Sequence, residues 1–99
     1  MRVVYRLAAA RDIEKARAWY ETERSGRGGR FQLAVEALVQ VIGDHPDAFP
    51  VVRANVRRAF VSRFPYALYY QLLDDETLEV IACLHTRRHP RTWERGYDA

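Results

Sequence analysis

A chain of 99 residues in which 48% of the side chains are apolar is long enough for one small domain, spanning residues 1–99, and too short for two. The net charge is only +3, but the basic side chains are unusual, since Lys15 is the only lysine among sixteen of them. The planar guanidinium of arginine binds phosphates and carboxylates bidentately, so this composition fits an anionic partner. A GC-rich genome, whose codons favour arginine over lysine, accounts for the same bias equally well.

Several classes of protein do not fit this sequence. No stretch approaches the ~20 apolar residues that a membrane span needs, and the N-terminal run MRVVYRLAAARD becomes charged too early for a signal peptide. The one cysteine, Cys83, cannot form an internal disulfide, and its place in an apolar run indicates a small core side chain. We therefore expect a cytoplasmic protein that has no membrane partner.

The N-terminal part predicts a strand followed by a helix. Arg2–Leu7 is short and rich in branched residues, which is typical of strands. A helix then starts around Ala8–Ala10, and its apolar stripe at helical spacing consists of Ala9, Ile13, Ala16 and Tyr20. This helix lacks a good N-terminal capping residue, so we expect Asp12 to compensate by interacting with the helix dipole.

A glycine-rich segment at residues 25–29, SGRGG, predicts a tight turn that ends the first helix. It does not match the phosphate-binding pattern GxxxxGK[ST], so we interpret it as a connection between helices. The second helix is predicted over Arg30–Gly43, and its wide apolar face consists of Phe31, Ala34, Val35, Leu38, Val41 and Ile42. The two helices then form an antiparallel hairpin that needs a sheet to cover its apolar side.

Three strands are predicted in the second half, over Val56–Arg63, Tyr66–Leu73 and Leu78–His85. The polar segment Asp74–Thr77 has the length of a hairpin turn. Consecutive strands with short connections form an antiparallel meander. The predicted fold is therefore α+β, in the order β-α-α-β-β-β, with a helical hairpin packed on a small, mainly antiparallel sheet. The edge at which the first strand joins this sheet is left open.

The central predicted strand has two unlike faces, because alternate side chains of a strand point to opposite sides. Gln71 shares a face with Ala67, Tyr69 and Leu73. The other face is bulkier and has no amide, and it consists of Tyr66, Leu68, Tyr70 and Leu72. We expect this bulkier face to pack against the helices and Gln71 to be a surface residue.

Basic side chains gather on and after the predicted sheet. Arg57 and Arg63 are expected on one face of their strand and Arg58 on the other. Metal-free cleavage of RNA needs a base, an acid and a cation beside the phosphate, and the residues available for these roles are Arg63, His85, Arg87, Arg88, His89 and Tyr97. A histidine that ends a strand is more often a structural residue bonded to the backbone, so both interpretations of His85 stay open. Three histidines and one cysteine without a short spacing form no metal site, and we expect no cofactor.

Four stretches together resemble the RelE/ParE superfamily, the toxins of bacterial type II toxin–antitoxin pairs. They are Asp12-Ile13 with Tyr20, Arg57-Arg58 followed by Phe64-Pro65-Tyr66, Leu68-Tyr69-Tyr70, and the run VIACLHTRRHPRTW from Val80 to Trp93. The resemblance covers nearly the whole chain and implies the same fold. It also implies a cognate antitoxin protein that binds the toxin and neutralises it.

The superfamily has two activities on one fold, so the fold does not decide between them. RelE-like members cut mRNA in the ribosomal A site without a metal, and ParE-like members poison DNA gyrase. The HxRRxP ending and the lack of a lysine-rich site make this chain similar to the ParE-like branch, so we expect a growth-inhibiting toxin that acts on gyrase. A ribosome-dependent mRNA endonuclease and a non-toxic binding relative stay as alternatives.

The residue pattern and the resemblance together give three sets of candidate site residues. If the protein is a nuclease, the catalytic set is Arg63, His85 and Arg88. Target binding is assigned to Arg57, Arg87, Arg88 and Trp93. Antitoxin binding is assigned to an exposed groove on the helical hairpin, with contacts from Trp19, Leu33 and Arg58.

Overall fold

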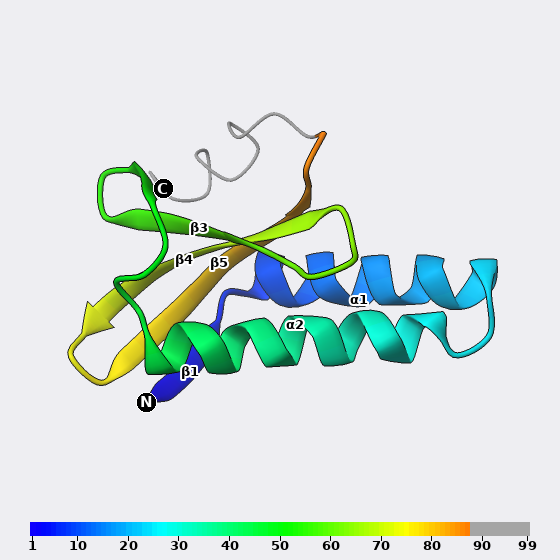
Figure 1. Ribbon diagram of the computed structural model, residues 1–99, viewed down its shortest axis with the longest axis horizontal. Coiled ribbons are helices and arrows are strands. Elements are labelled where there is room, and N and C mark those ends of the chain that lie inside the picture. Colours follow the sequence, from blue (N-terminus) through cyan, green and yellow to red (C-terminus); the bar gives the residue numbers. More distant parts are fainter. Residues whose placement is uncertain (88–99) are drawn as a thin grey trace.

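The computed structural model describes residues 1–87, in which two helices cover one face of a five-stranded sheet (Figure 1). Helices α1 (Leu7–Glu23) and α2 (Arg27–Asp44) form an antiparallel hairpin. The strands are β1 (Arg2–Tyr5), β2 (Val51–Arg53), β3 (Val56–Phe60), β4 (Tyr66–Asp74) and β5 (Thr77–His85). Their order across the sheet is β1-β5-β4-β3-β2, and all neighbours are antiparallel except β1 and β5. The predicted α+β fold is confirmed.

Strand β1 takes the edge of the sheet beside β5, which the sequence left open. It runs parallel to β5 and pairs only with the first part of that strand, Thr77–Val80. Beyond this pairing, the backbone N–H of Cys83 donates to the Asp12 carboxylate of α1 over 3.1 Å. Asp12 therefore bonds α1 to the sheet edge, whereas the sequence suggested only an interaction with the helix dipole.

The strand predicted over Val56–Arg63 is shorter than expected, and a further strand precedes it. Val51–Arg53 forms β2, which pairs with β3 across the turn Ala54–Asn55. This hairpin was missed because its turn contains no glycine, and Ala54 itself adopts the left-handed φ of 49°. Strand β3 ends at Phe60, and Arg63 lies in the following turn with a φ of 69°. The expectation that Arg57 and Arg63 share one face of a strand is therefore wrong.

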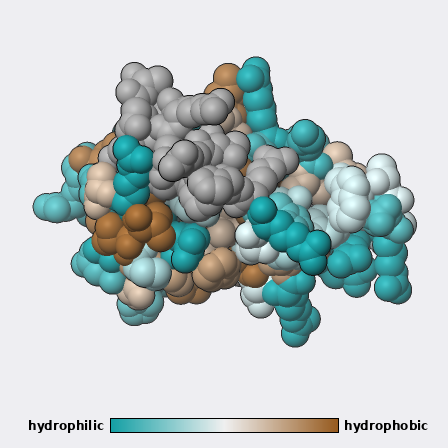
Figure 2. Space-filling view, turned by 90° about the horizontal axis from the view of Figure 1, so that it is seen from above, coloured by the Kyte–Doolittle hydropathy of each residue, from teal (hydrophilic) through white to brown (hydrophobic). Residues whose placement is uncertain are grey.

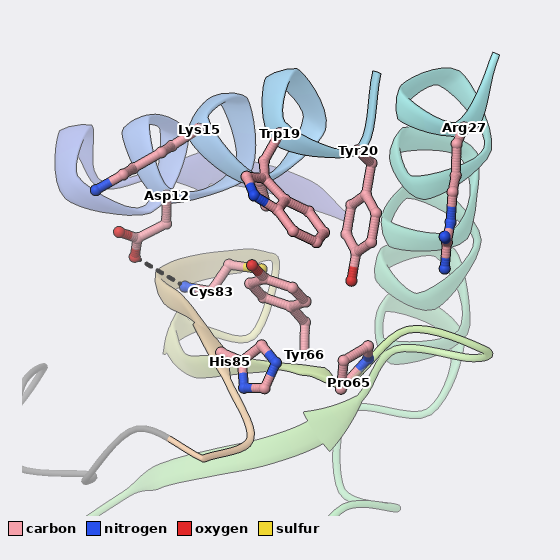
Figure 3. A pocket seen from close by; sticks show the side chains of 10 residues that line it. Asp12, Lys15, Trp19, Tyr20, Arg27, Pro65, Tyr66, Cys83 and His85 are labelled. Carbon is pink, nitrogen blue, oxygen red and sulfur yellow. Dashed lines mark hydrogen bonds between the residues drawn. The ribbon is translucent and has the colours of Figure 1, made fainter. Parts of the chain in front are cut away.

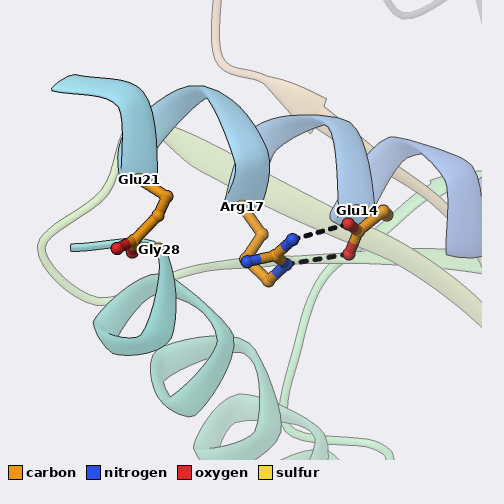
Figure 4. Close-up of polar contacts among 4 residues, drawn as sticks. All are labelled: Glu14, Arg17, Glu21 and Gly28. Atoms are coloured by element: carbon orange, nitrogen blue, oxygen red, sulfur yellow. Dashed lines mark hydrogen bonds and ion pairs between the residues drawn. The ribbon is translucent and has the colours of Figure 1, made fainter. Parts of the chain in front are cut away.

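Helix α2 begins three residues earlier than predicted, because only Gly26 of the glycine segment is needed for the turn. Gly26 has a φ of 88°, a conformation that glycine adopts without strain. Gly28 already lies inside α2, where the helices touch: a Cβ there would come within 2.5 Å of the Arg17 carbonyl oxygen (Figure 4). The Glu21 carboxylate accepts the N–H groups of Gly26 and Gly28 at 3.0 and 3.1 Å, which lowers its pKa. At its other end α2 continues through Gly43, which was expected to stop it, to Asp44.

The main hydrophobic core lies between the hairpin and the sheet. On β4, Leu68 and Tyr70 are buried in it and Tyr66 and Leu72 pack against it, so the predicted helix-facing side of this strand is confirmed. A register shift opposite Tyr69 and Tyr70 places an extra residue in β5. This bulge brings Cys83 into the same core as Leu78 and Val80, although its sequence spacing from them is odd.

Part of the opposite face of the sheet is buried as well, which the sequence did not suggest. A second hydrophobic cluster on this face consists of Val56, Ala67, Tyr69, Ile81, Ala82 and Leu84. Gln71 is only 9% exposed and its amide donates to Glu79 over 2.8 Å, so the expectation that it is a surface residue is wrong. In the described part of the chain, no helix is both long enough and apolar enough to span a bilayer.

Candidate functional site

A hollow of about 480 Å³ opens between α1 and the end of β5, and we call it the aromatic hollow (Figure 3). Helix α1 supplies one wall, and the last residues of β5 and the start of β4 supply the other. Figure 3 shows Trp19 and Tyr20 directed towards Tyr66 and His85 across the opening. The full lining is Asp12, Lys15, Ala16, Trp19, Tyr20, Arg27, Pro65, Tyr66, Cys83 and His85. Trp19 is 55% exposed, so this hollow presents a large apolar surface to solvent.

His85 is held in the aromatic hollow by two contacts. Its ring packs edge-on against Tyr66, its cross-strand neighbour, with centroids 5.2 Å apart. Its Nδ1 accepts the backbone N–H of Arg87 over 3.2 Å. The ring is therefore bonded to the backbone, as in the structural interpretation, although its partner is an N–H and not a carbonyl. An Nδ1 that accepts leaves the proton of the neutral ring on Nε2.

Cys83 lies at the floor of the aromatic hollow but cannot serve as a nucleophile there. Burial, together with the Asp12 carboxylate, raises the pKa of this thiol to about 12. The side chain is 1% exposed, and the thiolate is the reactive form of cysteine. The thiol is therefore a core side chain, as the sequence predicted.

A second hollow, of about 520 Å³, lies beside the first at the end of the molecule where the hairpin turns. We call it the arginine hollow. It is formed by the start of α2, the end of α1 and the turn between β3 and β4, and its lining is Arg24, Arg27, Arg30, Leu33, Ala34, Ser62, Arg63 and Phe64. Hydrophilic side chains project from this end of the molecule in the space-filling view (Figure 2). Among residues 1–87, none of those that line this hollow is acidic.

Arg27 lines both hollows and joins them into one surface. Its guanidinium lies over the ring of Tyr20 at 5.0 Å and over that of Phe64 at 5.9 Å. These rings belong to a buried aromatic group with Phe31 and Tyr66, in which neighbouring centroids lie 4.9 to 6.1 Å apart. The position of Arg27 is therefore fixed by stacking on the core.

Of the three residues assigned to antitoxin binding, the structure places two on this joined surface. Trp19 lies in the aromatic hollow and Leu33 in the arginine hollow, and both are more than half exposed. Arg58 lies on β3 opposite Tyr69, and its guanidinium is 5.1 Å from the ring centre of Phe60. Because Tyr69 belongs to the cluster on the far face of the sheet, Arg58 is not part of the hairpin surface.

The residues assigned to target binding and catalysis are also dispersed. Arg57 donates to the Phe49 carbonyl oxygen over 2.6 Å and lies near Asp47, so its guanidinium anchors the loop after α2. Arg87 is exposed just after β5. Arg63 and His85 line different hollows. Arg88 and Trp93 lie outside the described residues.

The sequence analysis missed the three arginines of the hairpin turn, Arg24, Arg27 and Arg30. Their signal was available, because they recur every third residue on either side of a predicted turn. Within residues 1–87, no three histidine, cysteine or acidic side chains come close enough together to hold a metal ion.

A helical hairpin on a mainly antiparallel sheet, in this element order, is the architecture of the RelE/ParE-like toxins. A solved structure described as the chromosomal ParDE toxin–antitoxin system from P. aeruginosa contains a similar chain, with a TM-score of 0.62 over 86% of this chain and 95% of that chain. The two sequences are 14% identical, so this likeness concerns the fold. A search of curated proteins finds no match.

The amino-acid sequence of the chain matches a known protein family. Residues 3–90 match the family described as the ParE toxin of the type II toxin-antitoxin system, parDE. This match covers most of the 99 residues, and the chain therefore belongs to the ParE toxin family.

Proposed function

We propose that this protein is the toxin of a type II toxin–antitoxin pair, that it acts on DNA gyrase, and that a cognate antitoxin neutralises it. The observation that carries the proposal is the match of residues 3–90 to the ParE toxin family. Poisoning of gyrase is the activity of the ParE-like branch of the superfamily, and the resemblance of the HxRRxP ending to that branch points the same way. The chain of similar fold comes from a ParDE toxin–antitoxin system.

The arrangement of the candidate catalytic residues supports a gyrase target over mRNA cleavage. A nuclease site needs its base and its phosphate-binding cation within contact of one reacting group. Arg63 and His85 line different hollows, and Nδ1 of His85 accepts the backbone N–H of Arg87. The only lysine, Lys15, is on α1. The described residues therefore favour a toxin that acts by binding.

The antitoxin surface is proposed along the aromatic hollow and the arginine hollow beside the helical hairpin. Exposed apolar side chains of this size mark sites of protein association, and Trp19 and Leu33 are 55% and 65% exposed. They lie in adjacent hollows that share Arg27, so one bound segment can contact both. A neutralising protein that covers this surface fits the proposed function.

The target can be tested with the purified protein in two parallel assays. We expect it to inhibit the supercoiling of relaxed plasmid by gyrase and to leave mRNA intact on ribosomes with an empty A site. Cleavage of the mRNA without an effect on gyrase would contradict the proposal. In that case, loss of cleavage in both Arg63→Ala and His85→Ala would assign the activity to the nuclease set instead.

A further inference from the structure

The aromatic hollow contains a buried hydroxyl group that has no partner in the described part of the chain. Tyr20 is only 3% exposed, and Figure 3 shows its hydroxyl pointing into the opening between α1 and the start of β4. Within residues 1–87, this hydroxyl forms no hydrogen bond. Burial raises the pKa of Tyr20, so the hydroxyl keeps its proton at neutral pH. Because buried polar groups are nearly always hydrogen-bonded, this hydroxyl is a donor available to a ligand.

The other polar groups of the aromatic hollow are mainly donors as well. Lys15 and Arg27 are exposed, and neither forms an ion pair in the described part of the chain. Nε2 of His85 carries the proton of the neutral ring, because Nδ1 accepts a backbone N–H. Among the described residues, Asp12 is the only acidic side chain of the lining, and it already accepts the N–H of Cys83. The hollow therefore favours a ligand that brings acceptors and negative charge.

The walls of the aromatic hollow suit a flat ring. Trp19 is 55% exposed, and its ring meets that of Tyr20 at 77°, so much of the indole surface stays open. On the opposite wall, the rings of Tyr66 and His85 pack against each other with centroids 5.2 Å apart. The volume of about 480 Å³ lies within the ~300–1,000 Å³ of small-molecule sites. Nucleotide bases bind to protein surfaces by stacking on aromatic side chains of this kind.

The two cations lie on opposite sides of these rings, as Figure 3 shows. The guanidinium of Arg27 lies 5.0 Å from the ring centre of Tyr20, and a guanidinium binds a phosphate through two parallel hydrogen bonds. On the other side, Lys15 is one helical turn after Asp12 on α1, so a donor and an acceptor lie next to each other. The edge of a purine base also carries both acceptors and donors, and a carboxylate can accept more than one hydrogen bond.

We propose that the aromatic hollow binds a purine mononucleotide. Its base stacks on Trp19 and contacts Tyr66 and His85, with its edge towards Lys15. Its phosphate accepts hydrogen bonds from Arg27 and from the Tyr20 hydroxyl. This site does not depend on the proposed function, because neither gyrase nor an antitoxin takes part in the binding.

The ligand can be tested by isothermal titration calorimetry of the 99-residue chain. The probes are GMP and AMP. Their counterparts are guanosine, which lacks the phosphate, inorganic phosphate, which lacks the ring, and indole-3-acetate, which joins a ring to a carboxylate. We expect saturable binding of a nucleotide that is about tenfold or more tighter than that of each counterpart, because both parts of the nucleotide make contacts.

Two pairs of variants test the residues. Tyr20→Phe removes only the hydroxyl and keeps the buried ring, and its matched control is Tyr5→Phe, whose hydroxyl is on β1 and outside the aromatic hollow. Arg27→Gln removes the phosphate contact, and its matched control is Arg11→Gln, an exposed residue of α1 that lines neither hollow. We expect Tyr20→Phe and Arg27→Gln each to bind the nucleotide about tenfold more weakly, and both controls to bind it like the wild type. Guanosine should bind Arg27→Gln and the wild type equally, because it has no phosphate.

Three outcomes would overturn the proposal. They are no saturable binding of either nucleotide at millimolar concentration, equal affinity of Tyr20→Phe and Tyr5→Phe, and binding of inorganic phosphate or indole-3-acetate as tight as that of the nucleotides. If Arg27→Gln fails to fold, Trp19→Ala replaces it, since it removes an exposed ring and should weaken nucleotide binding by a similar factor. A chain that inhibits gyrase without binding nucleotides would refute this site and keep the proposed function, whereas a nucleotide-binding chain without effect on gyrase would do the reverse.

Discussion

Replacing Leu68 with alanine is expected to lower the free energy of unfolding by about 2–5 kcal/mol. Leu68 is on β4, the middle strand of the sheet, and is completely buried beneath the hairpin. The substitution removes apolar contacts and leaves a space that the surrounding helices and strands cannot fully close. Denaturant titration of the wild type and the variant measures the difference.

The matched control for this experiment is the same substitution on the same strand. Leu73 is 54% exposed near the end of β4, so Leu73→Ala should change the free energy of unfolding by no more than about 0.5 kcal/mol. If Leu73→Ala cost as much as Leu68→Ala, the helices would not cover the Leu68 face in the way described. Gln71 is not a suitable control, because it is buried and bonded to Glu79.

Adding a single methyl group at residue 28 should have the next largest effect on the free energy of unfolding. Gly28→Ala is expected to lower the free energy of unfolding by about 1–3 kcal/mol, because overpacking forces neighbouring elements apart. The added Cβ would be 2.5 Å from the Arg17 carbonyl oxygen and 3.0 Å from Glu21, and a backbone oxygen cannot move without shifting α1 (Figure 4). Thermal or denaturant unfolding of the variant measures the loss.

The neighbouring glycine provides the control. Gly29 is also in α2, but a Cβ added there meets nothing within 4 Å. Gly29→Ala should therefore stabilise the protein by about 0.5–1 kcal/mol, because alanine favours the helix and restricts the unfolded chain. If the two helices pack closely at Gly28, Gly28→Ala lowers the free energy of unfolding and Gly29→Ala raises it. A stabilised Gly28→Ala variant would mean that the helices are further apart.

The elements whose side chains repeat with a clear period were predictable from the sequence. Helix α1 shows this well, since its stripe of Ala9, Ala16 and Tyr20 is buried as expected. The side of β4 that faces the helices was also correct, because bulky residues alternate along it. The local sequence pattern is sufficient to predict the buried side chains of these elements, because the period of a helix or strand decides which side chains share a face.

The features that the sequence could not give depend on contacts between distant segments. The glycine segment had the composition of a longer turn, but Gly28 is helical because α1 and α2 approach closely there. The bulge in β5 changes which side chains face the core. The residue types around Cys83 do not indicate that the strand has a bulge there. The parallel placement of β1 and the bond from Cys83 to Asp12 connect residues that are far apart in the chain.

Only part of the candidate site could be predicted, because its residues come from segments that are far apart in the sequence. Trp19 and Leu33 could be chosen from the sequence because they are large apolar residues that fall outside the apolar stripes of their helices. The arginine hollow needed the fold, since it brings Arg63 from the β3–β4 turn beside Arg24 and Arg30 from the hairpin. The bond from Arg57 to the Phe49 carbonyl oxygen also needed the fold, because an arginine on a strand gives no sign of the loop that will accept its hydrogen bond.

The central claim is that this chain is a toxin paired with an antitoxin, and growth of bacteria that express it tests this most directly. Induction of the chain alone should arrest growth, and co-expression with the small acidic protein expected from the neighbouring reading frame should restore it. The Leu68→Ala variant, which we expect to be destabilised, should arrest growth less. Normal growth of cells that accumulate the folded wild-type protein would contradict the claim, and so would an arrest that the neighbouring protein does not relieve.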